Sequence, residues 1–200
     1  MNTRVIQVGL GLLVLIGVVM AGVLLFPKAD TFRGTVFDPA PSAPEFELTR
    51  GNGDSFRLRE TRGDAVLLYF GYTSCPDVCP TTLSDLRRVL EELGPDAEQV
   101  QVIIVTVDPE RDTPQKLQEY VSIFDPAFIG LSGSMDELEK VWSDYGVYRE
   151  EEQLPNSATG YLVNHTARLY LIDQDGNMRL SYSFGTPTDD ILHDLKMLID

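Results

Sequence analysis

The two cysteines of this 200-residue chain, Cys75 and Cys79, lie within five residues of each other. The surrounding residues 71–80 read GYTSCPDVCP and follow an apolar run over 65–70 that is typical of a buried central strand. Cys79 falls at the start of the helix predicted next, where free backbone N–H groups and the helix dipole would stabilise a thiolate. Two thiolates this close can cycle between dithiol and disulfide or together bind a soft metal ion.

A structural disulfide is the simplest alternative for this pair. Closing so short a loop would contribute about 2 kcal/mol by the chain-entropy argument, which is little for a domain with a full apolar core. Two inert core thiols would not be interleaved with residues such as Pro76 and Asp77. The sequence therefore favours a functional pair.

The order of predicted elements places the cysteines at the carboxyl end of a central strand. We expect a hairpin over 46–57, strands over 65–70, 100–107, 167–172 and 179–184, and helices opening at Pro80, Thr113, Ser134 and Thr186. Strand–helix–strand followed later by hairpin and helix is the order of a thioredoxin-like α/β fold. Open α/β sheets carry their chemistry at the carboxyl ends of their strands.

One histidine stands where this fold should bring it to the cysteines. His165 precedes the strand predicted over 167–172, which should lie beside the cysteine loop. Two thiolates and one imidazole form a donor set suited to copper, because thiolate favours Cu(I) and imidazole accepts either oxidation state. Zinc would normally need a fourth ligand, and none is evident in the sequence. The other histidine, His193, falls on the solvent side of the last predicted helix and receives no role.

The spacing of the cysteines differs from that of redox enzymes with this fold. Such oxidoreductases usually have two residues between the cysteines and a cis-proline just before the facing strand. Here three residues intervene, and no proline lies between Pro155 and Pro187. The pattern therefore leans toward metal binding, and thiol–disulfide chemistry stays open.

Three motifs together resemble the Sco/SenC family, over roughly residue 46 to the carboxyl terminus. They are GYT before CPDVCP at 71–80, VDPERDTP at 107–114, and His165 followed by YLID at 170–173. Proteins of this family are membrane-tethered, have a thioredoxin fold, bind copper and help to assemble the CuA centre of cytochrome c oxidase. The resemblance therefore implies a copper site that works with Cu(I), Cu(II) or both.

The resemblance also implies roles for single residues. The copper ligands carried over from the family are Cys75, Cys79 and His165. Asp77 and the Asp108-Pro109 pair would shape the site without direct ligation. Two positions depart from the family pattern, because Ser74 stands where histidine is common and Asn164 where aspartate is common. Neither change removes a ligand, but loss of a carboxylate would alter partner docking or the basicity of the imidazole.

The amino terminus carries a separate apolar segment. Residues 5–26 are 22 residues without a charge, and a helix of that length rises roughly 33 Å, enough to cross a hydrocarbon core. Since signal peptides have a shorter apolar region of about 7–15 residues, residues 1–26 are predicted to be an uncleaved transmembrane anchor. The prolines of residues 27–44 indicate a tether. Residues 45–200 are expected to form the copper-binding domain.

Charge and composition exclude several classes of protein. The chain has 31 acidic and 16 basic side chains, a formal net charge of −15. That sign excludes a protein that binds nucleic acid by neutralising phosphates. Two cysteines exclude a disulfide-dense miniprotein and a Cys₄ zinc site. We expect the amino terminus inside and the acidic domain in the periplasm or an equivalent extracytoplasmic space.

Two functions of different classes follow. The first is a copper metallochaperone that delivers copper to the oxidase subunit carrying CuA, with other periplasmic copper carriers or thiol reductases as further partners. The second is an enzyme, a thiol–disulfide oxidoreductase that reduces the CuA cysteines, and His165 is needed by the first alone. A peroxidase would require an activating arginine near one thiolate, for which Arg87 and Arg88 are the candidates.

Overall fold

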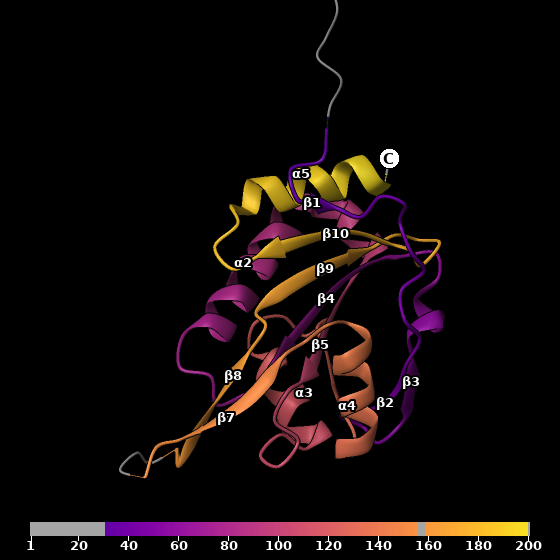
Figure 1. Cartoon of the computed structure of the whole chain (residues 1–200). Coiled ribbons are helices and arrows are strands. Elements are labelled where there is room, and N and C mark those ends of the chain that lie inside the picture. Colours follow the sequence, from indigo (N-terminus) through magenta and orange to yellow (C-terminus); the bar gives the residue numbers. More distant parts are fainter. Residues whose placement is uncertain (1–30, 156–158, 200) are drawn as a thin grey trace, which may run out of the picture. The chain divides into compact units, whose positions relative to one another are not determined.

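A mixed β-sheet carries the predicted site in the computed structural model, which describes residues 31–155 and 159–199 (Figure 1). Its strands are β1 (Thr35–Val36), β2 (Glu47–Arg50), β3 (Ser55–Arg57), β4 (Ala65–Gly71), β5 (Val100–Thr106), β6 (Ile129–Ser132), β9 (Arg168–Ile172) and β10 (Met178–Ser183). They are arranged in the order β1-β10-β9-β4-β5-β6-β2-β3. The compact unit to which they belong begins at Phe32.

Strand β4 lies inside this sheet and ends at the cysteine loop. All seven of its residues are buried. It pairs in parallel with β5, from Ala65 opposite Val100 to Gly71 opposite Thr106, and antiparallel with β9. The apolar run over 65–70 predicted a strand covered on both faces, and this prediction is confirmed.

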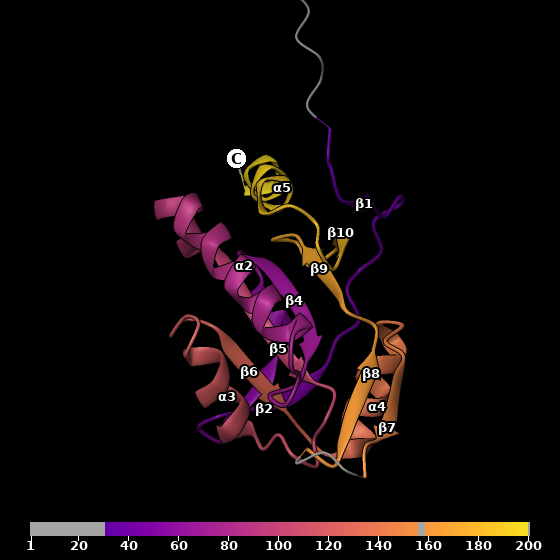
Figure 2. The ribbon, with the colours of Figure 1, turned by 90° about the vertical axis from the view of Figure 1, so that its left-hand side faces the viewer.

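Helices cover both faces of the sheet. Among the described residues they are α2 (Val78–Leu93), α3 (Pro114–Ser122), α4 (Met135–Asp144) and α5 (Thr188–Ile199), with short 3₁₀ helices η1 (Leu58–Thr61) and η2 (Gly94–Gln99). Figure 2 shows α2, α3 and α5 on one side of the sheet and α4 on the other. With β10, β9, β4 and β5 adjacent, β4-α2-β5 followed by β9-β10-α5 has the predicted thioredoxin-like order.

Helix starts follow the local signals in the sequence. Helix α4 opens at the predicted Ser134 with a capping box, because the Ser134 hydroxyl accepts the N–H of Glu137 and the Glu137 carboxylate accepts the N–H of Ser134. Helix α2 begins at Val78, two residues before the predicted start at Pro80. Proline is tolerated in a first helical turn, where its missing N–H has no partner in the helix, so Pro80 does not mark the boundary.

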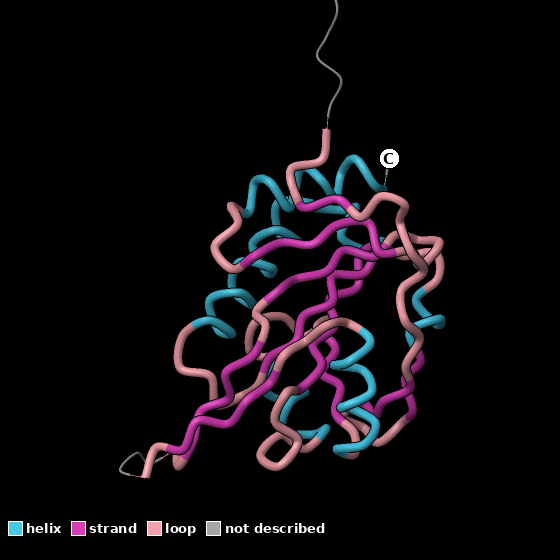
Figure 3. Tube along the Cα trace, in the orientation of Figure 1, coloured by secondary structure: helices cyan, strands magenta, loops and turns pink. Residues whose placement is uncertain are grey.

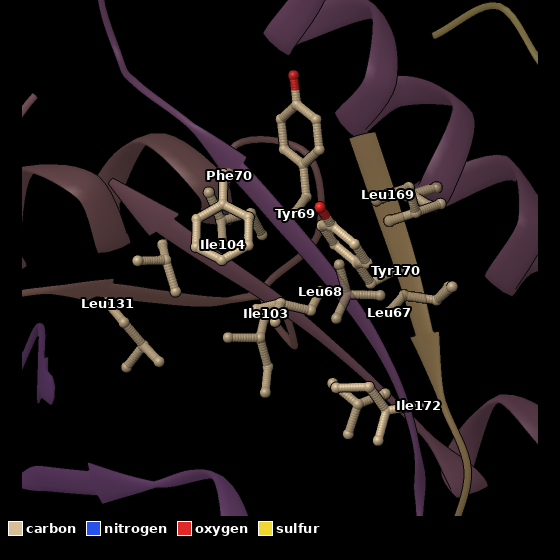
Figure 4. Close-up of a cluster of buried hydrophobic side chains, with 14 of the residues drawn as sticks. Leu67, Leu68, Tyr69, Phe70, Ile103, Ile104, Leu131, Leu169, Tyr170 and Ile172 are labelled. Carbon is tan, nitrogen blue, oxygen red and sulfur yellow. The ribbon is translucent and has the colours of Figure 1, made fainter. Parts of the chain in front are cut away.

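Neighbouring side chains of β4 face different helices, because side chains alternate across a strand. The ring of Phe70 packs against Tyr145, just beyond α4, with centroids 5.5 Å apart. Tyr69 points the other way and reaches Cys79 in α2. Figure 4 shows the two rings leaving the strand in different directions within the buried cluster. The identity of the residue at 69 therefore bears on the cysteine site, and that at 70 does not.

A two-stranded sheet, β7 (Arg149–Gln153) paired antiparallel with β8 (Tyr161–His165), lies outside the main sheet. Figure 3 shows this hairpin extending away from the remaining strands. The sequence did not predict it, since β7 reads REEEQ and glutamate disfavours strands. Its second strand ends at His165, so the histidine is delivered by a hairpin and not by β9 itself.

Residues 32–44, predicted as part of a tether, lie along the domain. Strand β1 pairs with β10, and Ala43 is buried. The buried carboxylate of Asp194 in α5 accepts the backbone N–H groups of Arg33 and Gly34 at 2.8–3.1 Å. These contacts move the start of the domain from residue 45 toward the amino terminus.

The predicted anchor over residues 1–26 lies outside the described residues. Within the part of the chain that the structure does describe, no helix combines the length and the apolar character needed to cross a membrane. His193, expected on the solvent side of α5, is half-buried there.

Candidate metal centre

The cysteine loop connects the end of β4 to the first turn of α2. Cys79 is the second residue of α2 and is 1% exposed, whereas Cys75 is half-buried before the helix. The Cys79 backbone N–H donates to the sulfur of Cys75 at 3.4 Å. The free N–H groups of the helix start were expected to stabilise a thiolate at Cys79. They serve Cys75 instead, because its side chain folds back over the helix terminus.

The two thiols consequently differ in acidity. Hydrogen bonds from the Cys79 thiol and from the backbone N–H groups of Cys79, Asp77 and Val78 lower the pKa of Cys75 to about 6. The hydrogen bond that Cys79 donates and its burial both raise the pKa of Cys79. At neutral pH the site therefore holds a Cys75 thiolate beside a Cys79 thiol.

Residues of strand β4 contact the sulfur of Cys79. The Tyr69 hydroxyl lies 3.6 Å from the Cys79 sulfur. Burial raises the pKa of Tyr69, so the phenol keeps its proton and serves as a donor. A Cβ at Gly71 would lie 2.7 Å from the Tyr69 ring and 3.2 Å from the Cys79 sulfur. Position 71 thus needs glycine, because ring and sulfur already fill the space.

His165 reaches the same sulfur from the end of β8. Its Nε2 lies 4.0 Å from the Cys79 Sγ, and its Nδ1 lies 3.2 Å from the Thr166 carbonyl oxygen. A carbonyl can only accept, so Nδ1 carries the proton and the Nε2 lone pair faces the sulfur. Burial lowers the pKa of His165, which keeps the imidazole neutral. A neutral imidazole with a directed lone pair is the form that binds metals.

Cys75 and His165 line a cleft of about 210 Å³ between the cysteine loop and β8, and Cys79 is buried beside it. Ligand distances near 2.3 Å to sulfur and 2.0 Å to nitrogen place two donors on one ion at most about 4.3 Å apart. The 4.0 Å between Cys79 Sγ and His165 Nε2 falls within that span. Across residues 31–155 and 159–199, no cluster of three or more His, Cys, Asp or Glu side chains is already gathered into a metal site. Binding of one ion by Cys75, Cys79 and His165 together would therefore require a side-chain movement.

Asp112 fixes the cysteine loop to the end of β5. Its fully buried carboxylate accepts the backbone N–H of Thr73 at 2.9 Å and the Thr73 hydroxyl at 2.5 Å. It also accepts the hydroxyl of Thr106, the last residue of β5, at 3.0 Å. The VDPERDTP motif thus supplies the anchor for the loop, a role the sequence did not reveal.

The same motif holds the hairpin that carries His165. The Arg111 guanidinium donates to the carbonyl oxygen of Tyr161 at 2.9 Å and lies 3.7 Å from the centre of the Tyr161 ring. Buried Asp108 accepts from Arg111 and, at 2.8 Å, from the Tyr161 hydroxyl. With these partners Asp108 shapes the site through β8.

Other residues singled out in the sequence lie around the cleft or away from it. Asp77 and Asn164 line the cleft, and the Asn164 amide donates to Glu152 at 3.1 Å. Arg87 and Arg88 are about half exposed and pair with carboxylates of their own helix α2. Neither guanidinium serves as the thiolate-activating group that a peroxidase needs.

The thioredoxin-like sheet thus carries two cysteines at a helix start and, from a separate hairpin, an imidazole beside one of them, and these side chains could exchange disulfides or bind a soft metal. Comparison with known proteins makes this assignment more specific. The SCO1/SenC family model matches residues 36–200, so the chain belongs to the SCO1/SenC family.

Individual relatives agree with this assignment. An SCO2-like protein of Rickettsia prowazekii is 38% identical over 66% of this chain, and the chain spans only 64% of that relative. The copper-bound structure of Bradyrhizobium japonicum ScoI is 40% identical, covers 80% of this chain and 99% of its own, and gives a TM-score of 0.70. BsSco, described as a member of the Sco family of cytochrome c oxidase assembly proteins, is 25% identical over 80% of this chain and 94% of its own, with a TM-score of 0.61.

Proposed function

We propose that this protein is a membrane-tethered copper metallochaperone that delivers copper to the CuA site of cytochrome c oxidase. Copper is its cargo, and its ligands are Cys75, Cys79 and His165. Residues 1–26 anchor it, with the amino terminus inside and the domain in the extracytoplasmic space. The oxidase subunit that carries CuA receives the copper.

One observation carries the proposal more than any other. The β7–β8 hairpin lies outside the main sheet, yet it brings the Nε2 of His165 to 4.0 Å from the sulfur of Cys79. A thiol–disulfide exchange site needs no imidazole on the buried sulfur, whereas a soft metal bound by two thiolates gains a third ligand from it. Copper-bound ScoI at 40% identity supports the same cargo.

The residues of the site prepare it for a soft cation at neutral pH. Cys75, with its pKa lowered to about 6, is already a thiolate, and His165 is already neutral. Cys79 must lose its proton when copper enters, since only thiolates bind the metal strongly. Binding at pH 7 therefore releases about one proton.

A thiol–disulfide oxidoreductase is the second candidate. The half-buried Cys75 thiolate can attack a partner's disulfide, and the buried Cys79 beside it can then displace the partner's thiol. The products are a Cys75–Cys79 disulfide and a reduced partner. The difference in acidity between the two thiols favours this candidate.

His165→Ala separates the two functions. We expect the full chain purified in detergent to lose at least 10–100-fold in copper affinity, because loss of a direct ligand costs no less than loss of a group that supports one. Reduction of a CuA-type disulfide peptide should change far less. Both are measured on wild type and variant, with oxidase assembly in cells at limiting copper.

Two controls frame this experiment. His193→Ala removes the other histidine and should leave copper affinity and peptide reduction at wild-type levels. Cys79→Ser should abolish both activities. Normal oxidase assembly by His165→Ala at limiting copper would reject the chaperone and favour the reductase.

A further inference from the structure

Tyr69 touches the site without being one of its proposed ligands. Its side chain is 1% exposed, and its hydroxyl lies 3.6 Å from the sulfur of Cys79. The two cysteine sulfurs therefore have different hydrogen-bond donors. Cys75 has the backbone N–H of Cys79 at 3.4 Å, and Cys79 has the phenol of Tyr69 in addition to the backbone N–H of Tyr72. A main-chain donor is the same whatever the residue, but the phenol depends on tyrosine at this position.

The packing leaves the phenol little freedom to turn away. Tyr69 and Gly71 share one face of β4, and the space above Gly71 is occupied by the Tyr69 ring and the Cys79 sulfur. The edge of the His165 ring closes another side, with ring centroids 6.5 Å apart at 70°. In Figure 4 the hydroxyl of Tyr69 stands at the end of a ring directed away from Phe70.

The direction of this hydrogen bond is fixed by chemistry once metal is bound. A coordinated thiolate carries no proton and can only accept, so the phenol must donate to sulfur. A donor on a thiolate withdraws electron density from it and weakens its donation to the metal. Hydrogen bonding around a cysteine sulfur is a known means of tuning the potential of a copper–thiolate site. Weaker thiolate donation disfavours Cu(II) more than Cu(I).

We propose that Tyr69 is a positioning residue that donates a hydrogen bond to the Cys79 thiolate and thereby biases bound copper toward Cu(I). This inference rests on the proposed function, because it requires copper on Cys79. Two cysteines and one histidine can bind either Cu(I) or Cu(II), and in this proposal Tyr69 determines which of the two is preferred.

Tyr69→Phe tests the assignment, since it removes the hydroxyl and keeps the ring. In the full chain purified in detergent, the ratio of Cu(II) to Cu(I) affinity should rise about 10-fold, at the lower end of effects of groups that support a ligand. The thiolate-to-Cu(II) charge-transfer absorption should move to longer wavelength, because the sulfur becomes a better donor. Both are measured by competition titration and by visible spectroscopy.

Tyr170→Phe is the matched control. Tyr170 is a buried tyrosine of β9 whose hydroxyl donates to the carbonyl oxygen of Tyr145 at 2.7 Å. Its loss costs a buried hydrogen bond in the same sheet, yet the absorption and the affinity ratio should stay at wild-type values. Equal spectra and equal ratios for Tyr69→Phe and Tyr170→Phe would overturn the inference. Failure of the wild type to bind copper would instead reject the proposed function.

A second substitution covers a Tyr69→Phe variant that fails to fold. Site-specific replacement of Tyr69 by 3-fluorotyrosine keeps the hydroxyl and makes it a stronger donor. The charge-transfer absorption should then shift to shorter wavelength and the affinity ratio should fall further toward Cu(I). An absorption unchanged by the fluorine substitution would overturn the inference as well.

Discussion

The cysteine loop and the β7–β8 hairpin border the same cleft, but the molecule holds them by different means. The loop continues from a strand whose seven residues are all buried, and the sheet and α2 fix both of its ends. The hairpin forms its own two-stranded sheet, and a small group of polar contacts from residues 108–111 joins it to the loop region. The thiols thus sit at the end of a strand of the hydrophobic core, whereas the imidazole sits on a hairpin that combines these polar contacts with the buried Val163 and the packing of the His165 ring on Tyr69 and Tyr72.

The largest expected effect is the loss of copper affinity in acid, which acts mainly through the two cysteines. Above pH 6 copper binding displaces about one proton, that of Cys79, so affinity should fall about 10-fold per pH unit. Below the pKa of Cys75, about 6, a second proton competes, and the fall should approach about 100-fold per unit. His165, with its lowered pKa, adds a third proton only at lower pH. A single constant slope between pH 8 and pH 5, measured by competition titration, would contradict the difference between the two thiols.

Asp112→Asn tests how firmly the loop is anchored. The carboxylate accepts three hydrogen bonds from Thr73 and Thr106, so the free energy of unfolding should fall by about 1.5–3 kcal/mol. Urea unfolding of a variant lacking residues 1–26 measures the change. As a control, Asp125→Asn alters a half-buried carboxylate that accepts only one N–H, from Ala127, and should cost less than about 0.5 kcal/mol. Equal losses in the two variants would mean that Asp112 is no special anchor.

Arg111→Gln tests how far the contacts of Arg111 hold the β7–β8 hairpin in place. Without the guanidinium, β8 loses the donor to Tyr161 and the partner of Asp108. Copper affinity should drop about 10-fold, amide hydrogen exchange in β8 should accelerate, and the alkylation rate of Cys75 should stay constant. Arg87→Gln, which removes an exposed pair with Glu91, should change none of these. Slower or faster alkylation of Cys75 in Arg111→Gln would show that loop and hairpin are not independent.

The parts of the fold that follow local rules were predictable. The strand over 65–70 and the helix start at Ser134 each follow from neighbouring residues, the first from its apolar run and the second from its capping box. That Cys75 and Cys79 lie together at one site was predictable for the same reason, because they are neighbours in the sequence. Their unequal acidity could not, because it depends on which sulfur the helix N–H groups reach.

Long-range contacts account for what the sequence left out. β7 forms although its glutamates disfavour a strand, because β8 pairs with it and Arg149 donates to the Val107 carbonyl oxygen. Residues 32–44 look like a tether by their prolines, but the buried Asp194 binds their backbone. Arg111 and Asp112 stood out only as members of a motif, and Tyr161 was not singled out at all. The sequence signal that could have revealed these roles was an arginine followed by an aspartate, in a motif that has no proposed copper ligand.

The contrast in burial between the two cysteines has a consequence for the sequence of events in transfer. On the proposed function, an incoming ligand from a partner would meet Cys75 and His165 at the cleft, because Cys79 is 1% exposed beneath them. Exchange at the metal would then proceed from the outer donors inward, with the bond to Cys79 the last to break. A partner with one available donor would stop at a shared complex, and a partner offering two or more would complete the handover. The burial of the Cys79 sulfur thus determines how many ligand atoms the recipient must supply.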